Sequence, residues 1–531
     1  MSSPLVEWDY LSILQSVSWA TGGKFFIPDH PPLYSFLLSF FSGHPGSIMY
    51  FRSLNLLAVA LTAFLLYGFS RKYLERGLSL LAVAFYLLTP AVIQGVSLLD
   101  FADTSWLPLA FLLLLKLAAS QLTRFSVSGW LALAAASVLC LSFKITSSAA
   151  LFLPFALYWL TGGKDVKRSF LPVLAALAAG SIVFYLGWKA ASPHLFPVGV
   201  TPDTYAIARD TVLSRLASIL SPETAGKWLV HLAAVLFWFS PFLLALLALP
   251  FLKGRSREVP AVPAEIRFLY FAGLFYFIVY FLAGGLNHGF PRYQMAIWPL
   301  IAFLSVFGSR TALLGFLEKD ILKTSAIAGL AALPGIIFLP DPLRILNLGL
   351  KQALISGIGL GAVFGGLAAV SIFYLFLIWL SSRRANGGAF ASLMAAVLAF
   401  YLVTDLSQMR ARYLTSYEYG TAGMAELAAG LRSSVPAGAR IFATPGLLYY
   451  VRPDRAPGYG TGNWSSDAAI KAVITGDLPE VVVLSFGSNT LRQFQLFRSD
   501  PELTAFLGAN YVREEAGTFL LWRKKARLEK K

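Results

Sequence analysis

The chain has 531 residues, of which 57% are hydrophobic and only 13% are charged. Soluble globular proteins carry about 25% charged residues, so this composition excludes a soluble enzyme, a disordered chain and a coiled coil. The single cysteine, Cys140, excludes a disulfide framework and a cysteine-based zinc site. The net charge of +16 is carried mostly by short loops between apolar runs, where a membrane protein meets anionic lipid headgroups. The sequence therefore predicts a polytopic α-helical membrane protein without a nucleic-acid partner.

The amino-terminal segment, residues 1–47, holds two acidic motifs on either side of a short amphipathic stretch. Residues 7–10 read Glu-Trp-Asp-Tyr, and residues 28–34 read Pro-Asp-His-Pro-Pro-Leu-Tyr. The run Leu33–Phe41 is apolar but too short to cross a bilayer, so we expect a helix that lies along the membrane interface. Asp29 could be the capping residue of this helix or a functional carboxylate, and the sequence favours neither.

Residues 48–412 are predicted to form the transmembrane domain. A helix needs about 20 apolar residues to cross the hydrocarbon core, and charged residues and Gly/Pro clusters divide this region into about twelve runs. The runs beside Lys144 and after Arg292 are short, which predicts helices buried in protein or lining a wet cavity. The predicted spans are Ile48–Phe69, Leu78–Val96, Trp106–Ser120, Val127–Ser142, Ile145–Leu160, Phe170–Trp188, Trp228–Leu252, Phe268–Leu286, Met295–Gly308, Ser325–Leu339, Ala353–Leu380 and Ala389–Asp405.

Lysine and arginine collect after the first, fifth, seventh and eleventh of these runs. Cytoplasmic loops carry an excess of such residues, so those loops are predicted to lie inside the cell. The outer face of the plasma membrane then receives residues 1–47, the loop Asp100–Asp103, the segment Lys189–Lys227, the turn Asn287–Tyr293 and everything after Asp405. An even number of spans would begin outside with no segment to carry the N-terminus across. We therefore expect that a first transmembrane helix is missing from this sequence; a short N-terminus translocated unaided is the alternative.

Residues 413–531 are predicted to form an exoplasmic α/β domain, because charged and turn residues return and the apolar runs shrink to strand length. Helical periodicity covers Glu418–Ser433 and Asp467–Thr475, and buried strands are expected at Arg440–Ala443 and Val481–Ser485. Residues 509–523 alternate like a hairpin. We find no internal repeat, a feature that many secondary transporters show.

The outer face is also predicted to carry charged side chains from separate segments. Asp103 is interpreted first as a helix N-cap, with Thr104 as the alternative cap, because both precede the helix expected from Trp106. Buried carboxylates otherwise need cationic or metal partners, and Lys144 and the turn around Arg292 could supply them. A guanidinium binds phosphate through paired hydrogen bonds, and an ammonium adds a point charge.

The residues of the turn Asn287–Tyr293 also have interpretations that involve no function. Arg292 could extend to the membrane surface beside Tyr293, an aromatic-belt residue, and His288 could be an ordinary loop histidine.

Taken in order, these motifs resemble the GT-C membrane glycosyltransferases, most closely the protein O-mannosyltransferases and the aminoarabinose transferases of lipid A. The resemblance rests on the acidic amino-terminal loop, the Asp29–Tyr34 element, the His-x-x-x-Arg-Tyr turn His288–Tyr293, the Pro-containing run Trp298–Leu300 and the carboxy-terminal α/β domain. It implies transfer of a sugar from a polyprenyl- or dolichyl-phosphate donor to a lipid, glycan or protein acceptor. The transfer would occur on the outer face with inversion at the anomeric carbon.

The resemblance also implies roles for individual residues. Asp9 or Glu7 would take the proton of the acceptor hydroxyl; the family usually shows Asp-Glu here, whereas this chain separates its two acids by Trp8. Asp29 matches the acid before the proline element. A divalent cation, Mg²⁺ or Mn²⁺, could lie between Asp9 and Asp29, although family members differ in metal use.

The donor phosphate is expected to face Arg292, with Lys144 and His288 beside it. We expect the donor phosphate, and not a protein carboxylate, to be the partner of Arg292. We also expect Asp9, Asp29 and Arg292 to converge on one outer-face cavity. Further substrate-binding candidates are Tyr10, His30, Tyr34, Asp100, Asp103 and Tyr293.

Two other functions compete with this interpretation. A transporter or flippase of lipid-linked saccharides would need charged residues at mid-span, for which Lys144 is the plausible example. A noncatalytic assembly factor would use the outer α/β domain to bind a partner.

Overall fold

The computed structural model describes fifteen stretches of the chain. They are residues 7–20, 31–42, 47–97, 99, 102–195, 239, 262–282, 292–317, 424–436, 438–443, 447–448, 451, 467–485, 500–516 and 519–525. The spans predicted at Ser325–Leu339, Ala353–Leu380 and Ala389–Asp405 lie outside these residues, and the span predicted at Trp228–Leu252 is described only at residue 239.

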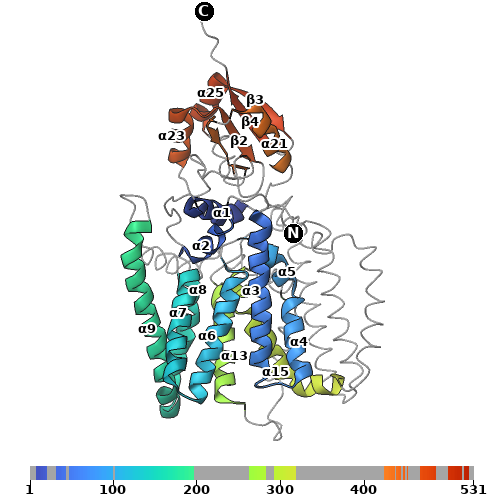
Figure 1. The fold of residues 1–531 in the computed structure, drawn as a ribbon, viewed down its shortest axis with the longest axis vertical. Helices are drawn as coiled ribbons and strands as arrows, with labels where there is room; N and C mark the ends of the chain where they lie inside the picture. Colours follow the sequence, from blue (N-terminus) through green and yellow to red (C-terminus); the bar gives the residue numbers. More distant parts are fainter. Residues whose placement is uncertain are drawn as a thin grey trace, which may run out of the picture.

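Apolar helices pack side by side into a membrane bundle (Figure 1). Within the described ranges, four helices are long and apolar enough to span a bilayer, and several others are shorter. The predicted spans from Ile48, Trp106, Val127, Ile145, Phe170 and Phe268 are each confirmed as helices. The helices are α3 (Ser47–Ser70), α6 (Trp106–Thr123), α7 (Val127–Phe143), α8 (Ile145–Thr161), α9 (Lys164–Leu195) and α13 (Ala264–Leu282).

The predicted span Leu78–Val96 is broken into two helices, α4 (Arg76–Leu87) and α5 (Pro90–Ser97), so that prediction was wrong. The span predicted at Met295–Gly308 is a helix from Trp298, α15 (Trp298–Leu317), and the short helix α14 (Arg292–Met295) precedes it after a second break. Each break precedes a proline, which has no N–H for the residue four positions earlier and whose ring clashes with that carbonyl. The proline then fits the first turn of the next helix.

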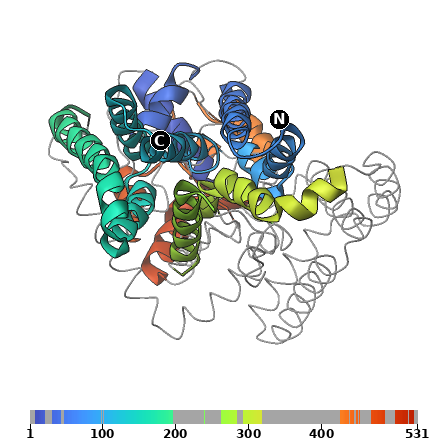
Figure 2. The same cartoon turned by 90° about the horizontal axis from the view of Figure 1, so that it is seen from below.

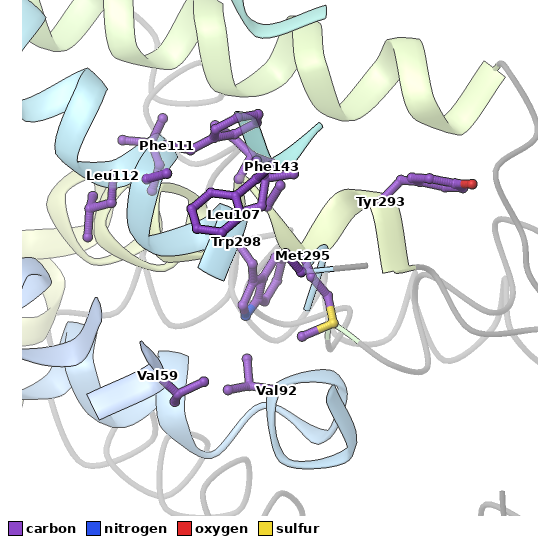
Figure 3. Packing of buried hydrophobic residues seen from close by; sticks show 14 of the residues in the cluster. Val59, Val92, Leu107, Phe111, Leu112, Phe143, Tyr293, Met295 and Trp298 are labelled. Carbon is purple, nitrogen blue, oxygen red and sulfur yellow. The ribbon is translucent and has the colours of Figure 1, made fainter. Parts of the chain in front are cut away.

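The two breaks lie against each other in the core. The Trp298 indole nitrogen donates a hydrogen bond to the Thr89 hydroxyl at 2.9 Å, and Trp298 is fully buried. Figure 3 shows Trp298 between Leu107 on one side and Val59 and Val92 on the other. Sequence periodicity could not show this contact, because it joins helix ends that are far apart in the chain.

Two short helices lie at one end of the bundle, next to the carboxy-terminal domain (Figure 1). They are α1 (Glu7–Ala20) and α2 (Leu33–Ser39), which pack on each other through an edge-to-face contact of Trp19 and Phe36. The short helix predicted from Leu33 is thus present. Pro32 is its N-cap residue and makes no side-chain cap bond.

Exposed basic residues lie at the opposite end of the bundle. The turn between α3 and α4 carries Arg71 and Lys72, and α9 begins at Lys164 after another turn at that end (Figure 1). These turns are among the loops predicted to be cytoplasmic, and that orientation stays a prediction.

The carboxy-terminal domain is a four-stranded sheet with helices packed on it. The strand order is β1-β2-β4-β3; β1 runs parallel to β2, and β4 is antiparallel to both β2 and β3. Ile474 and Leu503 pack with Val482 in one cluster, whereas Val481 and Val483 belong to the cluster that includes Leu431. The strands are β1 (Ile441–Phe442), β2 (Val481–Ser485), β3 (Tyr511–Ala516) and β4 (Phe519–Lys524), and the helices are α21 (Met424–Ser434), α23 (Asp467–Asp477) and α25 (Pro501–Asn510).

This domain confirms the predicted strands, the hairpin of β3 and β4 and the two predicted helices. Sequence reasoning overlooked α25. Its start was visible as Asp500-Pro501-Glu502, an N-cap acid followed by proline at the first helical position. The Asp500 carboxylate accepts a hydrogen bond from the Leu503 N–H at 3.0 Å.

Candidate active site

Three charged side chains from distant segments meet in a buried group, here named the ion cluster: Asp103, Lys144 and Arg292. The Lys144 ammonium donates a short hydrogen bond to Oδ2 of Asp103, and the Arg292 Nε lies 3.9 Å from the same oxygen. Asp103 is fully buried, and Lys144 and Arg292 are 5% and 6% exposed. Two cations thus converge on one carboxylate where water is largely excluded.

Lys144 occupies the junction of two helices. It is the residue between α7 and α8, and its backbone is extended, with φ −161° and ψ 114°. Its N–H donates to the Cys140 carbonyl and its own carbonyl accepts from Ser148, so both helix ends are satisfied. Since α6 and α7 are joined by a short turn at their other ends, Lys144 lies at the bundle end where α6 begins. It is therefore not a mid-span charge.

Asp103 does not cap α6, so that interpretation was wrong. The N-cap residue is Ser105, and no side chain caps the helix. The carboxylate points instead to Lys144, because pairing with a buried cation is worth more than an N-cap bond that the backbone can replace. The preceding residue, Ala102, has φ 66°, a left-handed conformation that a non-glycine residue adopts at a cost.

The loop around Asp103, residues 102–105, is also held in place by a hydrogen bond to α5. The Thr104 hydroxyl donates to the Gly95 carbonyl at 2.9 Å. A side chain at position 95 would meet Thr104 Cβ at 3.0 Å and the Met295 methyl at 2.6 Å. Glycine therefore permits the close approach of α5 to the loop and to α14.

Arg292 and Tyr293 are the first two residues of α14, and both side chains contact the ion cluster. The Lys144 ammonium lies 4.4 Å from the centre of the Tyr293 ring and the Arg292 guanidinium 4.7 Å, so both cations interact with its π face. Tyr280 stacks on the same ring with centroids 5.3 Å apart. Figure 3 shows the Tyr293 side chain directed away from the apolar packing around Trp298.

These contacts correct two expectations for Arg292. A residue that extends to the membrane surface would be exposed, whereas Arg292 is 6% exposed, so the surface alternative was wrong. The expectation that no protein carboxylate faces Arg292 was also wrong, because Asp103 does so at 3.9 Å.

A buried asparagine joins α2 to the Asp103 loop. The Asn55 side-chain oxygen accepts hydrogen bonds from the Tyr34 hydroxyl at 3.1 Å and from the Ser105 hydroxyl at 2.9 Å. Asn55 and Arg52 are 0% and 2% exposed on α3. Sequence reasoning missed both, although two polar residues three positions apart in an apolar run share one helix face and suggest a functional site.

Replacing Asn55 with leucine should destabilise the protein. Two buried hydroxyl groups would lose their acceptor, which costs about 1 to 3 kcal/mol each when they stay unsatisfied. Thermal unfolding in detergent measures the effect. Tyr34→Phe is the matched control, because it removes one donor and leaves Asn55 bonded to Ser105. Equal stability of the two variants would contradict the role of Asn55 as the shared acceptor.

Several predicted site residues are not placed by the structure. Glu7, Asp9 and Tyr10 lie in α1, but their side chains are not described, and Asp29, His30, Asp100 and His288 lie outside the described residues. The convergence of Asp9 and Asp29 with Arg292, and the divalent cation, therefore stay predictions. In the part of the chain that the structure covers, no three His, Cys, Asp or Glu side chains gather as a metal site would require.

Comparison with known proteins gives a match in structure but not in sequence. No family model matches the chain, and no curated protein sequence does. The crystal structure of ArnT from Cupriavidus metallidurans bound to undecaprenyl phosphate matches with a TM-score of 0.59 at 13% identity, covering 99% of this chain and 95% of that chain. The chain has the GT-C fold. The apo state of the same ArnT gives a TM-score of 0.50 at 14% identity, covering 98% of this chain and 94% of that chain.

The shared fold confirms the resemblance inferred from the motifs at the level of the fold. The oligosaccharyltransferase of Archaeoglobus fulgidus has a TM-score of 0.47 at 12% identity, covering 99% of this chain and 71% of that chain, which is too low to add to the assignment.

Proposed function

We propose that this protein is an integral-membrane, inverting glycosyltransferase. Its donor is a sugar linked to polyprenyl or dolichyl phosphate, and it transfers that sugar to an acceptor on the outer face of the membrane. The observation that carries the proposal is the ion cluster, in which the two buried cations Lys144 and Arg292 converge on Asp103 at the bundle end next to α1 and α2.

Phosphate suits this cluster better than a neutral ligand does. Sugar transfer leaves a negative charge on the departing lipid phosphate, and fixed cations in a dry site stabilise such charge strongly. Arg292 supplies planar paired donors and Lys144 a compact charge. Asp103 keeps both cations in place before the donor arrives, so little reorganisation is needed when charge develops.

The acidic residues of the amino-terminal segment are proposed to activate the acceptor. An inverting displacement needs a base on the face of the sugar opposite the leaving phosphate. Asp9, on α1, is the proposed base, with Glu7 as the alternative, and Asp29 is proposed to act beside it. The fold supports this assignment because α1 lies at the same end of the bundle as the ion cluster (Figure 1).

The fold match supports the donor class. The ArnT structure with which this chain shares its fold holds undecaprenyl phosphate. A lipid-phosphate carrier is thus compatible with this architecture, and the ion cluster offers a place for its phosphate. The sugar is left open, as is the choice among lipid, glycan and protein acceptors.

A flippase of lipid-linked saccharides is the second candidate, and the structure removes its main support, a charged residue in the middle of a span. It needed Lys144 as a mid-span charge, but Lys144 lies at a helix junction at the bundle end and is paired with Asp103. A noncatalytic assembly factor would not need two buried cations at the end of the bundle next to α1 and α2.

Sugar transfer from a purified polyprenyl-phosphate donor tests the proposal. Detergent-solubilised protein should release polyprenyl phosphate and glycosylate an acceptor, and Asp9→Asn and Asp29→Asn should lose this activity while staying folded. A panel of donors and acceptors would identify the substrates. Donor movement across liposome membranes without any sugar transfer would favour the flippase.

The orientation of the protein makes a separate prediction. Protease added to intact cells should remove the domain after Tyr413, because that domain lies at the end away from the basic turns. The exposed turn at Arg71 and Lys72 serves as the internal control and should be cut only after permeabilisation. Protection of the domain in intact cells would reverse the proposed orientation.

A further inference from the structure

An apolar pocket lies where α1 and α2 meet the ends of α7 and α9. Its volume is about 450 Å³, within the range of about 300 to 1,000 Å³ that small-molecule sites occupy. Four segments line it: Trp19 of α1, Pro31 to Phe36 around the start of α2, Val138 and Ser142 of α7, and α9 from Val183 to Leu195. None of the three residues of the ion cluster lines it, so it is separate from the proposed donor-phosphate site.

The lining of this pocket favours a hydrocarbon over a sugar or a phosphate. Ser142 supplies its single side-chain hydroxyl, and that hydroxyl already donates to the Val138 carbonyl at 2.8 Å. The other lining side chains are hydrophobic or aromatic, and among them only the indoles of Trp19 and Trp188 carry a polar group. A polar ligand would lose its water and gain few partners in such a site, whereas a hydrocarbon loses nothing.

The mouth of the pocket faces lipid. Val183 and Phe36 line it and are 59% and 41% exposed, and the neighbouring α9 residues Ile182 and Leu186 are each 58% exposed. The helix α9 is long and apolar enough to span a bilayer and lies at an edge of the described helices (Figure 2). The pocket is therefore continuous with an exposed apolar surface of α9 that we expect to contact lipid.

Aromatic side chains indicate where the pocket lies relative to the lipid headgroups. Trp188 stacks on Phe184 with parallel rings, and Trp19 faces the same space from α1. Tryptophan is enriched at the level of the lipid headgroups. A chain in this pocket would thus enter from the outer leaflet, with its headgroup near α1 and the Pro31-Pro32 step.

We propose that this pocket is a lipid site that binds one acyl chain of an outer-leaflet membrane lipid, distinct from the polyprenyl donor. The inference goes beyond the proposed function and does not depend on it. A membrane lipid is favoured as occupant because exposed apolar side chains of α9 continue the pocket lining; the polyprenyl chain of the donor is the competing occupant, which the test below distinguishes.

Gly187 offers a way to fill the pocket without disturbing the fold. It lines the pocket, and a Cβ added there would meet no atom within 4 Å. Gly187→Leu should place an isobutyl group in the space of the lipid chain. Leucine also favours a helix over glycine, so the change should not weaken α9. Gly68→Leu is the matched control, because Gly68 is also helical with open space around it but lies on α3, outside the pocket.

Photolabelling in lipid nanodiscs tests the site. One probe is a phospholipid with a diazirine in its acyl chain, and the other is a polyprenyl phosphate with a diazirine in its chain; labelled peptides are mapped by mass spectrometry. The phospholipid should label the Phe184–Trp188 segment of the wild type. Gly187→Leu should lower this labelling about tenfold, equivalent to 1.4 kcal/mol, and Gly68→Leu should not. Labelling at the exposed Leu171 should stay unchanged in both variants, and equal melting temperatures show that both are folded.

Two outcomes would overturn the proposal. Labelling of the segment that does not respond to Gly187→Leu would show ordinary contact of α9 with bulk lipid. Labelling by the polyprenyl phosphate in preference to the phospholipid would assign the pocket to the donor chain. Loss of sugar transfer is not the readout, so failure here is distinguishable from failure of the proposed function.

Discussion

Replacing Asp103 with alanine should destabilise the protein by about 3 to 5 kcal/mol, because it leaves Lys144 and Arg292 as buried cations without their shared carboxylate. Few single substitutions cost this much, and those that do usually break a buried network. Thermal unfolding in detergent should show a clear fall in the melting temperature. Asp165→Ala removes an exposed carboxylate from α9 and should leave the melting temperature nearly unchanged.

A triple variant separates the charge effect from lost packing. Asp103→Leu combined with Lys144→Met and Arg292→Met replaces the whole ion cluster by apolar side chains and should recover part of the stability, since removing all the partners costs less than leaving buried cations without their carboxylate. A triple variant as unstable as Asp103→Ala would show that packing, and not an uncompensated charge, dominates at this position.

Replacing Arg292 with alanine should abolish most activity with little loss of stability. Removal of one preorganised donor from a site of developing negative charge typically costs about 10²- to 10³-fold in turnover. Stability should change little, because Asp103 keeps its closer partner Lys144. The measurement is sugar transfer at saturating donor, together with the melting temperature.

Two further variants sharpen this prediction. Arg292→Lys should restore only part of the activity, since an ammonium keeps the charge and loses the paired donors. Arg310→Ala removes an arginine of α15 that lies over the Phe307 ring and should keep wild-type turnover. An Arg292→Ala protein that works normally, or one that melts as early as Asp103→Ala, would place Arg292 in a structural role only.

Much of the helical bundle could be predicted from local patterns. The helices α3, α6, α7 and α8 begin and end within a few residues of the predicted spans, because charged turns and glycine mark their ends. The break before Pro90 was not predicted, although proline in a helix interior is the ordinary cause of a break. The apolar run Leu78–Val96 continues through Pro90, so hydropathy alone does not show the break.

The ion cluster could be predicted only in part. The residue types followed from the chain, because Lys144 and Arg292 were both named as cations that could pair with a buried carboxylate or with phosphate. The pairing of Asp103 was only the second interpretation, because the pattern before Trp106 favours a local N-cap, whereas its contact with Lys144 lies 41 residues away. Local capping and long-range pairing compete for the same carboxylate, and a single sequence does not show which prevails.

The most direct test of the donor site is a cryo-electron microscopy structure of the protein with bound polyprenyl phosphate. The account predicts a phosphate whose oxygens lie about 2.7 to 3.2 Å from the Arg292 guanidinium or the Lys144 ammonium, with Tyr293 beside it. Asp9 and Asp29 should face the same space from the opposite side of the sugar site. A phosphate bound elsewhere, with the ion cluster unchanged and sealed from the ligand, would contradict the assignment of Lys144 and Arg292 to the donor.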